Sequence, residues 1–278
     1  MECARAPFAP GKSLSACVRA NQARSAGARD PRSPKRVLPS RAMNATRPTP
    51  HGTPTAPVRY LPFELRVLAE LPRFLAATRS LPHDWPRGDG HAVVVIPGYG
   101  MTDPTTWALR RALTQLGYVA HGWGLGRNVG VRRGLVDALH ARIDTLATGT
   151  GGPVSLVGWS LGGVYARELA RARPERVRRV FTLGSPFSGE PQANTIYHLR
   201  ALFTRRPVTL DRPAFDRRRP APPVPCIAMH TKTDGVVDWR CSLEDPGPHT
   251  ENVEVRGSHA GLVCNLEVLR VLAYRLPR

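Results

Sequence analysis

The chain has 278 residues, of which 41% are hydrophobic, and its 40 Lys and Arg against 21 Asp and Glu give a formal net charge of +19. This length allows one large domain or two small ones, and the absence of any run of about 18 apolar residues excludes a predicted membrane-spanning helix. The charge suggests nucleic-acid binding, but the arginines are spread along the whole chain with no basic run interleaved with aromatic residues, so we predict no specific nucleic-acid partner.

Residues 1–57 have the composition of a disordered, basic leader. Pro, Ser, Ala, Arg and Thr dominate this range, and it contains no periodic apolar run that could offset the entropy of ordering the chain. The range also lacks the apolar stretch of a secretory signal, whether translation starts at Met1 or at Met43, which predicts a cytoplasmic protein. We therefore place the folded domain at residues 58–278.

Leucines at spacings of three and four predict a helix over residues 60–80. They share one helical face, and they are Leu61, Leu65, Leu68, Leu71 and Leu75. We expect this face to pack against the core of the domain, because Arg and Glu occupy the opposite side without a lysine-rich surface. Peripheral contact with a membrane is the alternative.

Beyond residue 90, short apolar runs alternate with helical patterns. The runs predict six strands, which lie within residues 91–100, 118–126, 154–158, 177–186, 224–231 and 252–257. Asp103 and Pro104 are typical of a helix cap and first turn, and Gly117 ends that helix. Further helices are predicted over 131–147, after residue 160, and over 265–276.

This alternation predicts an α/β fold with a mostly parallel, doubly wound sheet of about six strands. In such a sheet the loops that carry chemistry gather at the carboxyl ends of the strands. Candidate functional residues are therefore sought where each predicted strand ends.

The segment "VSLVGWSLGGVYARELA", residues 154–170, places a serine between glycines where a buried strand passes into a helix. If the chain reverses within about one residue, the middle residue is strained, and small residues two positions before and after keep the neighbouring backbones apart. The hydroxyl is then held above the sheet edge. Ser160 is the predicted nucleophile; the alternative is a glycine-rich turn that only packs the helix on the strand.

A serine nucleophile needs a base, and histidine is the natural one. Of the nine histidines, only His249 and His259 follow the acid candidates, one before and one after the last predicted strand. A strand of about five residues separates its two ends by roughly 16 Å. Since the carboxyl end faces Ser160, His259 is the predicted base, and a solvated loop histidine is the alternative.

The base must be oriented by an acid, and two aspartates follow the fifth predicted strand. Asp234 is nearer the strand end and precedes Gly235, which permits a tight turn, so we prefer it. Asp238 remains the second candidate and could instead cap the next helical turn.

A developing oxyanion needs backbone N–H donors. The residue after the nucleophile, Leu161, is one predicted donor, and Tyr99 in "IPGYG" is the other, because Gly98 and Gly100 let that backbone approach a ligand closely. An ordinary glycine turn is the alternative for "IPGYG".

The order Ser160, Asp234, His259, together with "PGYG" and "GWSLGG", resembles the α/β-hydrolase superfamily over about residues 91–278. More narrowly, "TLGSPFSG", "TDGVV" and "GSHAGL" look like bacterial lipases and esterases. The resemblance implies hydrolysis of a small-molecule or lipid ester through an acyl-enzyme, with no cofactor and no metal. An acyltransferase or thioesterase with the same triad, and a non-catalytic binding protein on this scaffold, are the alternatives.

Two features depart from the lipase pattern. Pro97 stands where those lipases carry His, which removes a side chain that supports the oxyanion loop. The resemblance also places a cap over the acyl pocket in the insertion at about residues 190–223. That insertion holds one short amphipathic pattern, 196–203, and few large apolar residues, whereas a long-chain lipase usually has more. The sequence leaves the natural substrate and the oligomeric state open.

The five cysteines are odd in number and show no CxxC spacing, which predicts reduced thiols rather than a metal site or a complete disulfide framework. They are Cys3, Cys17, Cys226, Cys241 and Cys264. A disulfide between Cys241 and Cys264 is the alternative, because both lie near loops that the triad would bring together.

Overall fold

The computed structural model describes residues 58–188 and 217–277. The predicted leader, 1–57, and most of the predicted cap insertion, including its amphipathic pattern at 196–203, lie outside the described residues.

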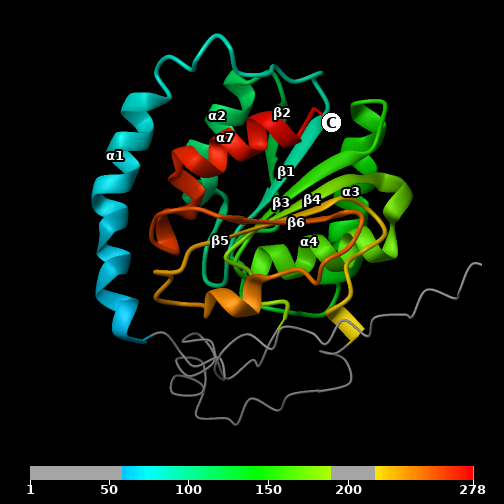
Figure 1. The fold of residues 1–278 in the computed structure, drawn as a ribbon. Coiled ribbons are helices and arrows are strands. Elements are labelled where there is room, and N and C mark those ends of the chain that lie inside the picture. The colour runs from blue at the N-terminus through cyan, green and yellow to red at the C-terminus, as the bar shows by residue number, and fades with distance from the viewer. Residues whose placement is uncertain (1–57, 189–216, 278) are drawn as a thin grey trace, which may run out of the picture. The chain divides into compact units, whose positions relative to one another are not determined.

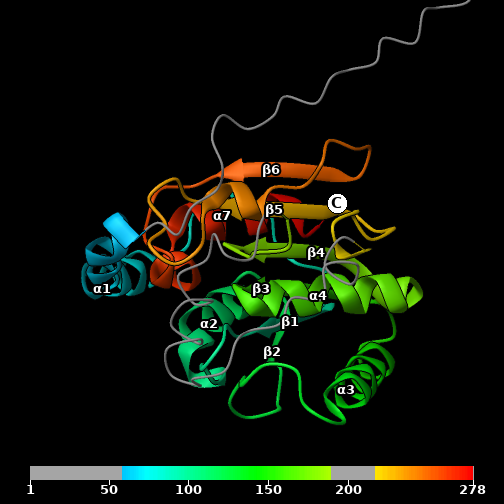
Figure 2. The ribbon, with the colours of Figure 1, turned by 90° about the horizontal axis from the view of Figure 1, so that it is seen from below.

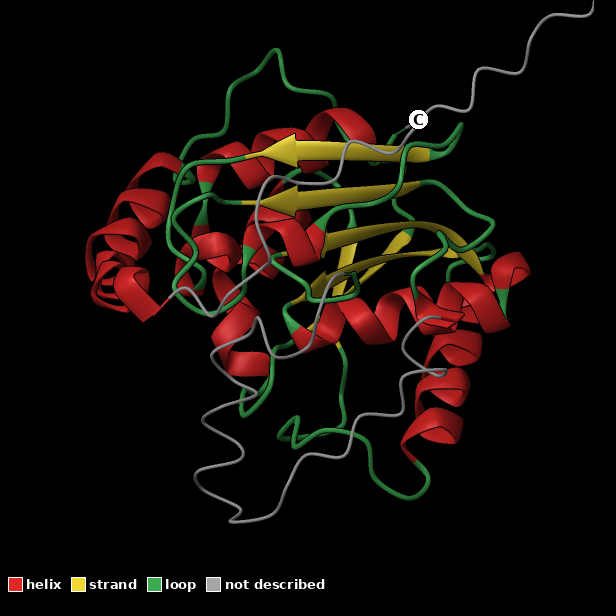
Figure 3. Ribbon diagram, turned by 60° about the horizontal axis from the view of Figure 1, so that its bottom comes forward, coloured by secondary structure: helices red, strands yellow, loops and turns green. Residues whose placement is uncertain are grey.

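Six strands form one sheet, in which every neighbouring pair is parallel. The spatial order is β2-β1-β3-β4-β5-β6, and the strands stand out in Figure 1 and Figure 3. Their bounds are β1 Ala92–Ile96, β2 Val119–Gly122, β3 Val154–Trp159, β4 Val177–Leu183, β5 Cys226–His230 and β6 Thr250–Glu254. The predicted number, direction and approximate positions of the strands are confirmed.

Helices cover both faces of the sheet (Figure 2). On β1, Val93 and Val95 share a core with α1, α2 and α7, whereas Val94 and Ile96 share a second core with α3 and α4. A central strand buried on both faces must be apolar at every position, which explains its continuous hydrophobic run. The helices are α1 Val67–Ala77, α2 Trp107–Gln115, α3 Leu135–Gly149, α4 Leu161–Ala172 and α7 Leu266–Arg275.

Within residues 58–188 and 217–277, no helix is both long enough and apolar enough to cross a bilayer.

The predicted helix over 60–80 forms, and only the later part of its leucine face packs against the core as expected. The segment begins as a 3₁₀ helix, Val58–Arg66, and continues as α1. Leu61, Leu65 and Leu68 are exposed, Leu68 by 74%. Leu71 and Leu75 pack against the core, in which Phe74 is buried. A 3₁₀ turn holds three residues rather than 3.6, so a stripe drawn at the α-helical period does not stay on one side of this segment.

Asp103 does not cap its own helix, so that part of the prediction is wrong. Thr102 occupies the cap position of the short 3₁₀ turn Asp103–Thr106, and the Asp103 carboxylate instead accepts hydrogen bonds from the N–H groups of Trp123 (2.9 Å) and Gly124 (3.0 Å). The side chain therefore connects the residues just after β2 to the 3₁₀ turn that precedes α2. Gly117, with φ +94°, follows α2 as predicted.

The thiol of Cys264 is free and buried, so the alternative disulfide with Cys241 does not form. Burial raises the pKa of Cys264 to about 12 and that of Cys226 to about 11. Both thiols therefore stay protonated near neutral pH, and protonated thiols are poor nucleophiles.

Arg167 on α4 contacts the chain at both ends of the insertion. Only 1% of its surface is exposed, and it forms a buried ion pair with Glu244. Its guanidinium lies 3.9 Å over the ring of Phe187, before the insertion, and donates to the carbonyls of Arg219 (2.9 Å) and Pro220 (3.1 Å), near the end of the insertion. Because one guanidinium binds both these carbonyls and the Glu244 carboxylate, the positions of all these segments depend on Arg167.

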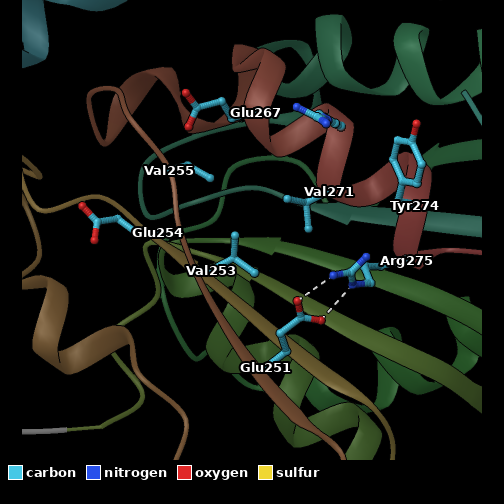
Figure 4. A pocket seen from close by; sticks show the side chains of 9 residues that line it. Glu251, Val253, Glu254, Val255, Glu267, Val271, Tyr274 and Arg275 are labelled. Carbon is cyan, nitrogen blue, oxygen red and sulfur yellow. Dashed lines mark hydrogen bonds and ion pairs between the residues drawn. The ribbon is translucent and has the colours of Figure 1, made fainter.

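We predict that Arg167→Ala lowers the free energy of unfolding by about 3–5 kcal/mol, because Glu244 is left buried without its counter-charge. Arg275→Ala is the matched control, since it removes a half-exposed pair with Glu251 (Figure 4) and should cost at most about 1 kcal/mol. Denaturant unfolding of the two variants measures the difference. Equal losses would contradict the structural importance of the Arg167 cluster.

Candidate active site

Ser160 directly follows β3 and has φ 53° and ψ −121°; it is the sole non-glycine residue with positive φ in the described ranges. The turn is sharp because α4 folds straight back onto the sheet. A Cβ on Gly158 would overlap the backbone of Gly163, and one on Gly162 would overlap the carbonyl of Ile96. The glycines around the serine are thus required by close backbone approach, and the backbone strain is concentrated at Ser160.

The carboxylate of Asp234 contacts the imidazole of His259. Asp234 Oδ2 lies 2.7 Å from His259 Nδ1, and both side chains are buried. Its other oxygen accepts hydrogen bonds from the N–H groups of Val236 (2.8 Å) and Val237 (2.7 Å). The turn after β5 therefore fixes the carboxylate so that one oxygen points at the histidine.

Asp238 has a different place in the structure. Its side chain accepts a hydrogen bond from the N–H of Arg240 (2.9 Å) and caps the short 3₁₀ turn Trp239–Ser242. This is the capping arrangement that the sequence left open for Asp238.

His259 is held to the serine turn through its backbone. Its carbonyl accepts a hydrogen bond from Trp159 Nε1 (3.1 Å), and the two rings lie 5.9 Å apart. Burial disfavours the charged imidazolium, but the carboxylates of Asp234 and Glu64 outweigh it, so the pKa of His259 lies above its ordinary value. The site thus stabilises a positive charge on this ring.

Gly184, at the end of β4, lies between the serine turn and the acid-histidine pair. The N–H of Ser160 donates to the carbonyl of Leu183 (2.8 Å), and a Cβ on Gly184 would lie 2.9 Å from His259 Nδ1 and 3.0 Å from Asp234 Oδ2. All three predicted residues therefore meet at one edge of the sheet. Among the described residues the Ser160 hydroxyl makes no hydrogen bond, so the structure joins acid to histidine but not serine to histidine.

The loop after β1 lies against the serine. A Cβ on Gly98 would come 3.3 Å from the Cβ of Ser160. In this part of the chain as described, no acceptor takes the N–H of Tyr99, and Leu161 is the first residue of α4, so its N–H has no partner within the helix. Both amides are thus available near the serine.

Asn128 supports this loop and was missed by the sequence analysis. It is fully buried; its Nδ2 donates to the carbonyl of Pro97 (2.8 Å). Its backbone carbonyl accepts from Gly100 N–H (2.6 Å), and its N–H donates to Met101 O (2.9 Å). Asn128 therefore supplies the support that the absence of His at position 97 had seemed to remove, and no local pattern in "GRNVG" signals this contact.

A groove of about 490 Å³ lies between β6 and α7 (Figure 4). Its walls combine the carboxylates of Glu251 and Glu267 with Arg270 and Arg275. None of the predicted site residues lines it, so this groove is separate from the candidate active site.

We predict that Gly184→Ala weakens the contact between Asp234 and His259 and lowers the pKa of the imidazole. The new Cβ would press on both partners, and φ +55° would strain any L side chain at this position. An NMR pH titration of the histidine C–H signals measures the pKa. Gly152→Ala, at a site where a Cβ meets nothing within 4 Å, is the control; an unchanged His259 titration in Gly184→Ala would contradict the prediction.

A protein-family model described as an alpha/beta hydrolase family matches residues 93–273. Among solved structures, the mature lipase BlEst2 of Bacillus licheniformis is similar with a TM-score of 0.54 and 16% identity, covering 71% of this chain and 96% of that one. A structure reported for the metagenome-derived lipolytic enzymes LipS and LipT is similar with a TM-score of 0.52 and 13% identity, over 69% and 94% of the two chains. At these identities the likeness shows a shared fold.

One curated protein, polyketide synthase ThaQ of Burkholderia thailandensis, is 44% identical over 105 residues. The match covers 35% of this chain and 5% of ThaQ, so the chain spans only a small part of that relative.

Proposed function

The chain belongs to the alpha/beta hydrolase family, and from that premise we propose that it cleaves carboxylic esters through an acyl-enzyme formed on Ser160. The observation that carries the proposal is the buried hydrogen bond between Asp234 and His259, placed beside a serine in a strained strand-to-helix turn. Those are the parts that activate a serine hydroxyl.

In this proposal His259 Nε2 takes the proton of the Ser160 hydroxyl as Oγ attacks the ester carbonyl carbon. The N–H groups of Tyr99 and Leu161 stabilise the oxyanion, and Asp234 stabilises the imidazolium. The imidazolium then gives its proton to the departing alcohol. Water attacks the acyl-enzyme by the same steps and releases the acid and Ser160.

The initial step requires the hydroxyl of Ser160 to reach the imidazole. A serine side chain turns about a single bond, Cα–Cβ, and catalytic hydrogen bonds often tighten only when substrate binds. The acid, the ring and the backbone of the serine turn are each held by hydrogen bonds of their own.

A thioesterase or acyltransferase reaction on the same triad is the second candidate. It is favoured by the 44% identity to a segment of a protein named a polyketide synthase. The two reactions share the acyl-enzyme and differ in the acyl donor and in the group that accepts the acyl chain. Turnover of matched ester and thioester series of increasing acyl length, with and without an added alcohol acceptor, distinguishes them.

The exposed leucines of residues 58–77 suit an ester substrate presented at a lipid surface. We include peripheral membrane contact in the proposal on this ground, beside small soluble esters as substrates. Sedimentation with anionic lipid vesicles tests it, and Leu65→Ser together with Leu68→Ser should reduce the bound fraction without altering hydrolysis of a soluble ester.

We predict that Ser160→Ala abolishes hydrolysis of a p-nitrophenyl acyl ester and labelling by a fluorophosphonate probe, because both need the same Oγ nucleophile. Thr145→Ala, which removes an exposed hydroxyl on α3, should leave both unchanged. Labelling retained in Ser160→Ala would remove Ser160 from the role of nucleophile.

We predict that kcat/KM falls with decreasing pH through a pKa above 6.5, the ordinary value for histidine. His259 must be neutral to act as a base, and its raised pKa moves the acidic limb of the pH profile to higher pH. Asp234→Asn should shift this limb to lower pH and reduce kcat by about 10⁴-fold, as in the type case of this triad. An acidic limb below the ordinary histidine value would contradict the assignment.

A further inference from the structure

We propose that Glu64 is a positioning residue for the triad: its carboxylate joins the loop that carries Asp234 to the loop that carries His259. The role rests on the ester-hydrolase function proposed above. Glu64 belongs to residues 58–77, which precede the stretch matched by the family model, 93–273.

One carboxylate contacts both loops. Glu64 Oε1 accepts hydrogen bonds from the N–H of Gly235 (2.8 Å), directly after the acid, and from the N–H of His259 itself (3.1 Å). Oε2 accepts from the N–H of Ala260 (2.7 Å). Three backbone donors on an ionised acceptor make a strong, directional contact, so the two loops cannot separate without breaking it.

Two further side chains of the same segment hold the neighbouring residues. Arg66 donates to Thr233 Oγ1 (2.8 Å) and to the carbonyl of Gly257 (2.8 Å). Glu70 accepts hydrogen bonds from the N–H (2.9 Å) and hydroxyl of Ser258. The segment therefore turns these polar residues toward the two catalytic loops, while Leu61, Leu65 and Leu68 are exposed.

At two positions in these loops, glycine leaves the room that the segment 58–77 occupies. A Cβ on Gly235 would lie 2.7 Å from the carbonyl oxygen of Tyr60, and one on Gly261 would overlap the Glu70 carboxylate. The predicted turn after Asp234 forms, but Gly235 does not have positive φ, so glycine is required here by close packing against Tyr60 and not by a left-handed backbone. In both catalytic loops, therefore, a residue larger than glycine would clash with the segment 58–77.

Glu64 also acts on the ring electrostatically. The charged groups around His259 are Asp234 at Nδ1, Glu64 at its backbone N–H, and Arg66 and Glu70 on the residues just before it. The charge of Glu64 raises the pKa of His259, in the same direction as Asp234. It thereby favours the imidazolium that forms when Ser160 attacks, an effect that a purely structural contact would lack.

The test compares three variants of the full chain. Glu64→Gln keeps the size of the side chain but removes the charge, and Glu64→Asp keeps the charge on a shorter side chain. Glu175→Gln is the matched control, because Glu175 pairs with Arg173 before the amino end of β4, the end opposite the triad. Ester kinetics over pH and an NMR titration of His259 are measured for each, with melting temperatures to show that each is folded.

We expect Glu64→Gln to lower kcat by about 10-fold with little change in KM for a small ester, because loop misplacement affects the chemical step. The acidic limb and the NMR pKa of His259 should both move to lower pH. Glu64→Asp should retain the wild-type limb despite a lower kcat, and Glu175→Gln should match the wild type in both.

A folded Glu64→Gln variant with wild-type kcat and an unmoved pH limb would overturn the proposal, even if it melted earlier, while the Ser160-dependent activity would stand. If the wild type shows no Ser160-dependent turnover, the ester-hydrolase function fails instead. The NMR titration then still decides whether Glu64 acts on the ring: an unchanged His259 pKa in Glu64→Gln ends that claim as well.

Discussion

The buried hydrogen bond between Asp234 and His259 is the interaction on which the rest of the site depends. It joins the loops after β5 and β6, which share no local structure, and it buries a titratable ring beside a carboxylate. Such a pair is favourable only when its remaining hydrogen bonds are satisfied. The N–H groups of Val236 and Val237 donate hydrogen bonds to the other oxygen of Asp234. The Trp159 indole donates to the backbone carbonyl of His259.

The segment 58–77, which lies outside the sheet, also supplies hydrogen bonds to the loops that carry this pair. Main-chain groups of the two loops form hydrogen bonds with the side chains of Glu64, Arg66 and Glu70. The segment's only buried α1 side chain, Phe74, anchors it to the core. The segment is therefore attached to the domain both through the core and through the site, so its folding and the geometry of the triad are coupled.

Support from distant residues recurs around the site. Asn128, from the loop after β2, holds the backbone that carries Tyr99, and Arg167 holds both ends of the insertion. In each case a buried polar side chain satisfies main-chain groups that loops cannot pair among themselves. Loops built in this way keep a fixed geometry although they lack regular secondary structure.

The sequence by itself determined the six parallel strands, because apolar runs and helical periods are local patterns that burial on both faces imposes. It also singled out Ser160, since close packing at Gly158 and Gly162 leaves a local signature, and strand polarity directed the choice of His259. Only the tertiary structure decided that Leu61, Leu65 and Leu68 are exposed and that Glu64 and Asn128 hold the loops. Those contacts span 195 and 31 residues, and a hydrogen bond to a distant main-chain group imposes no pattern on the residues beside it.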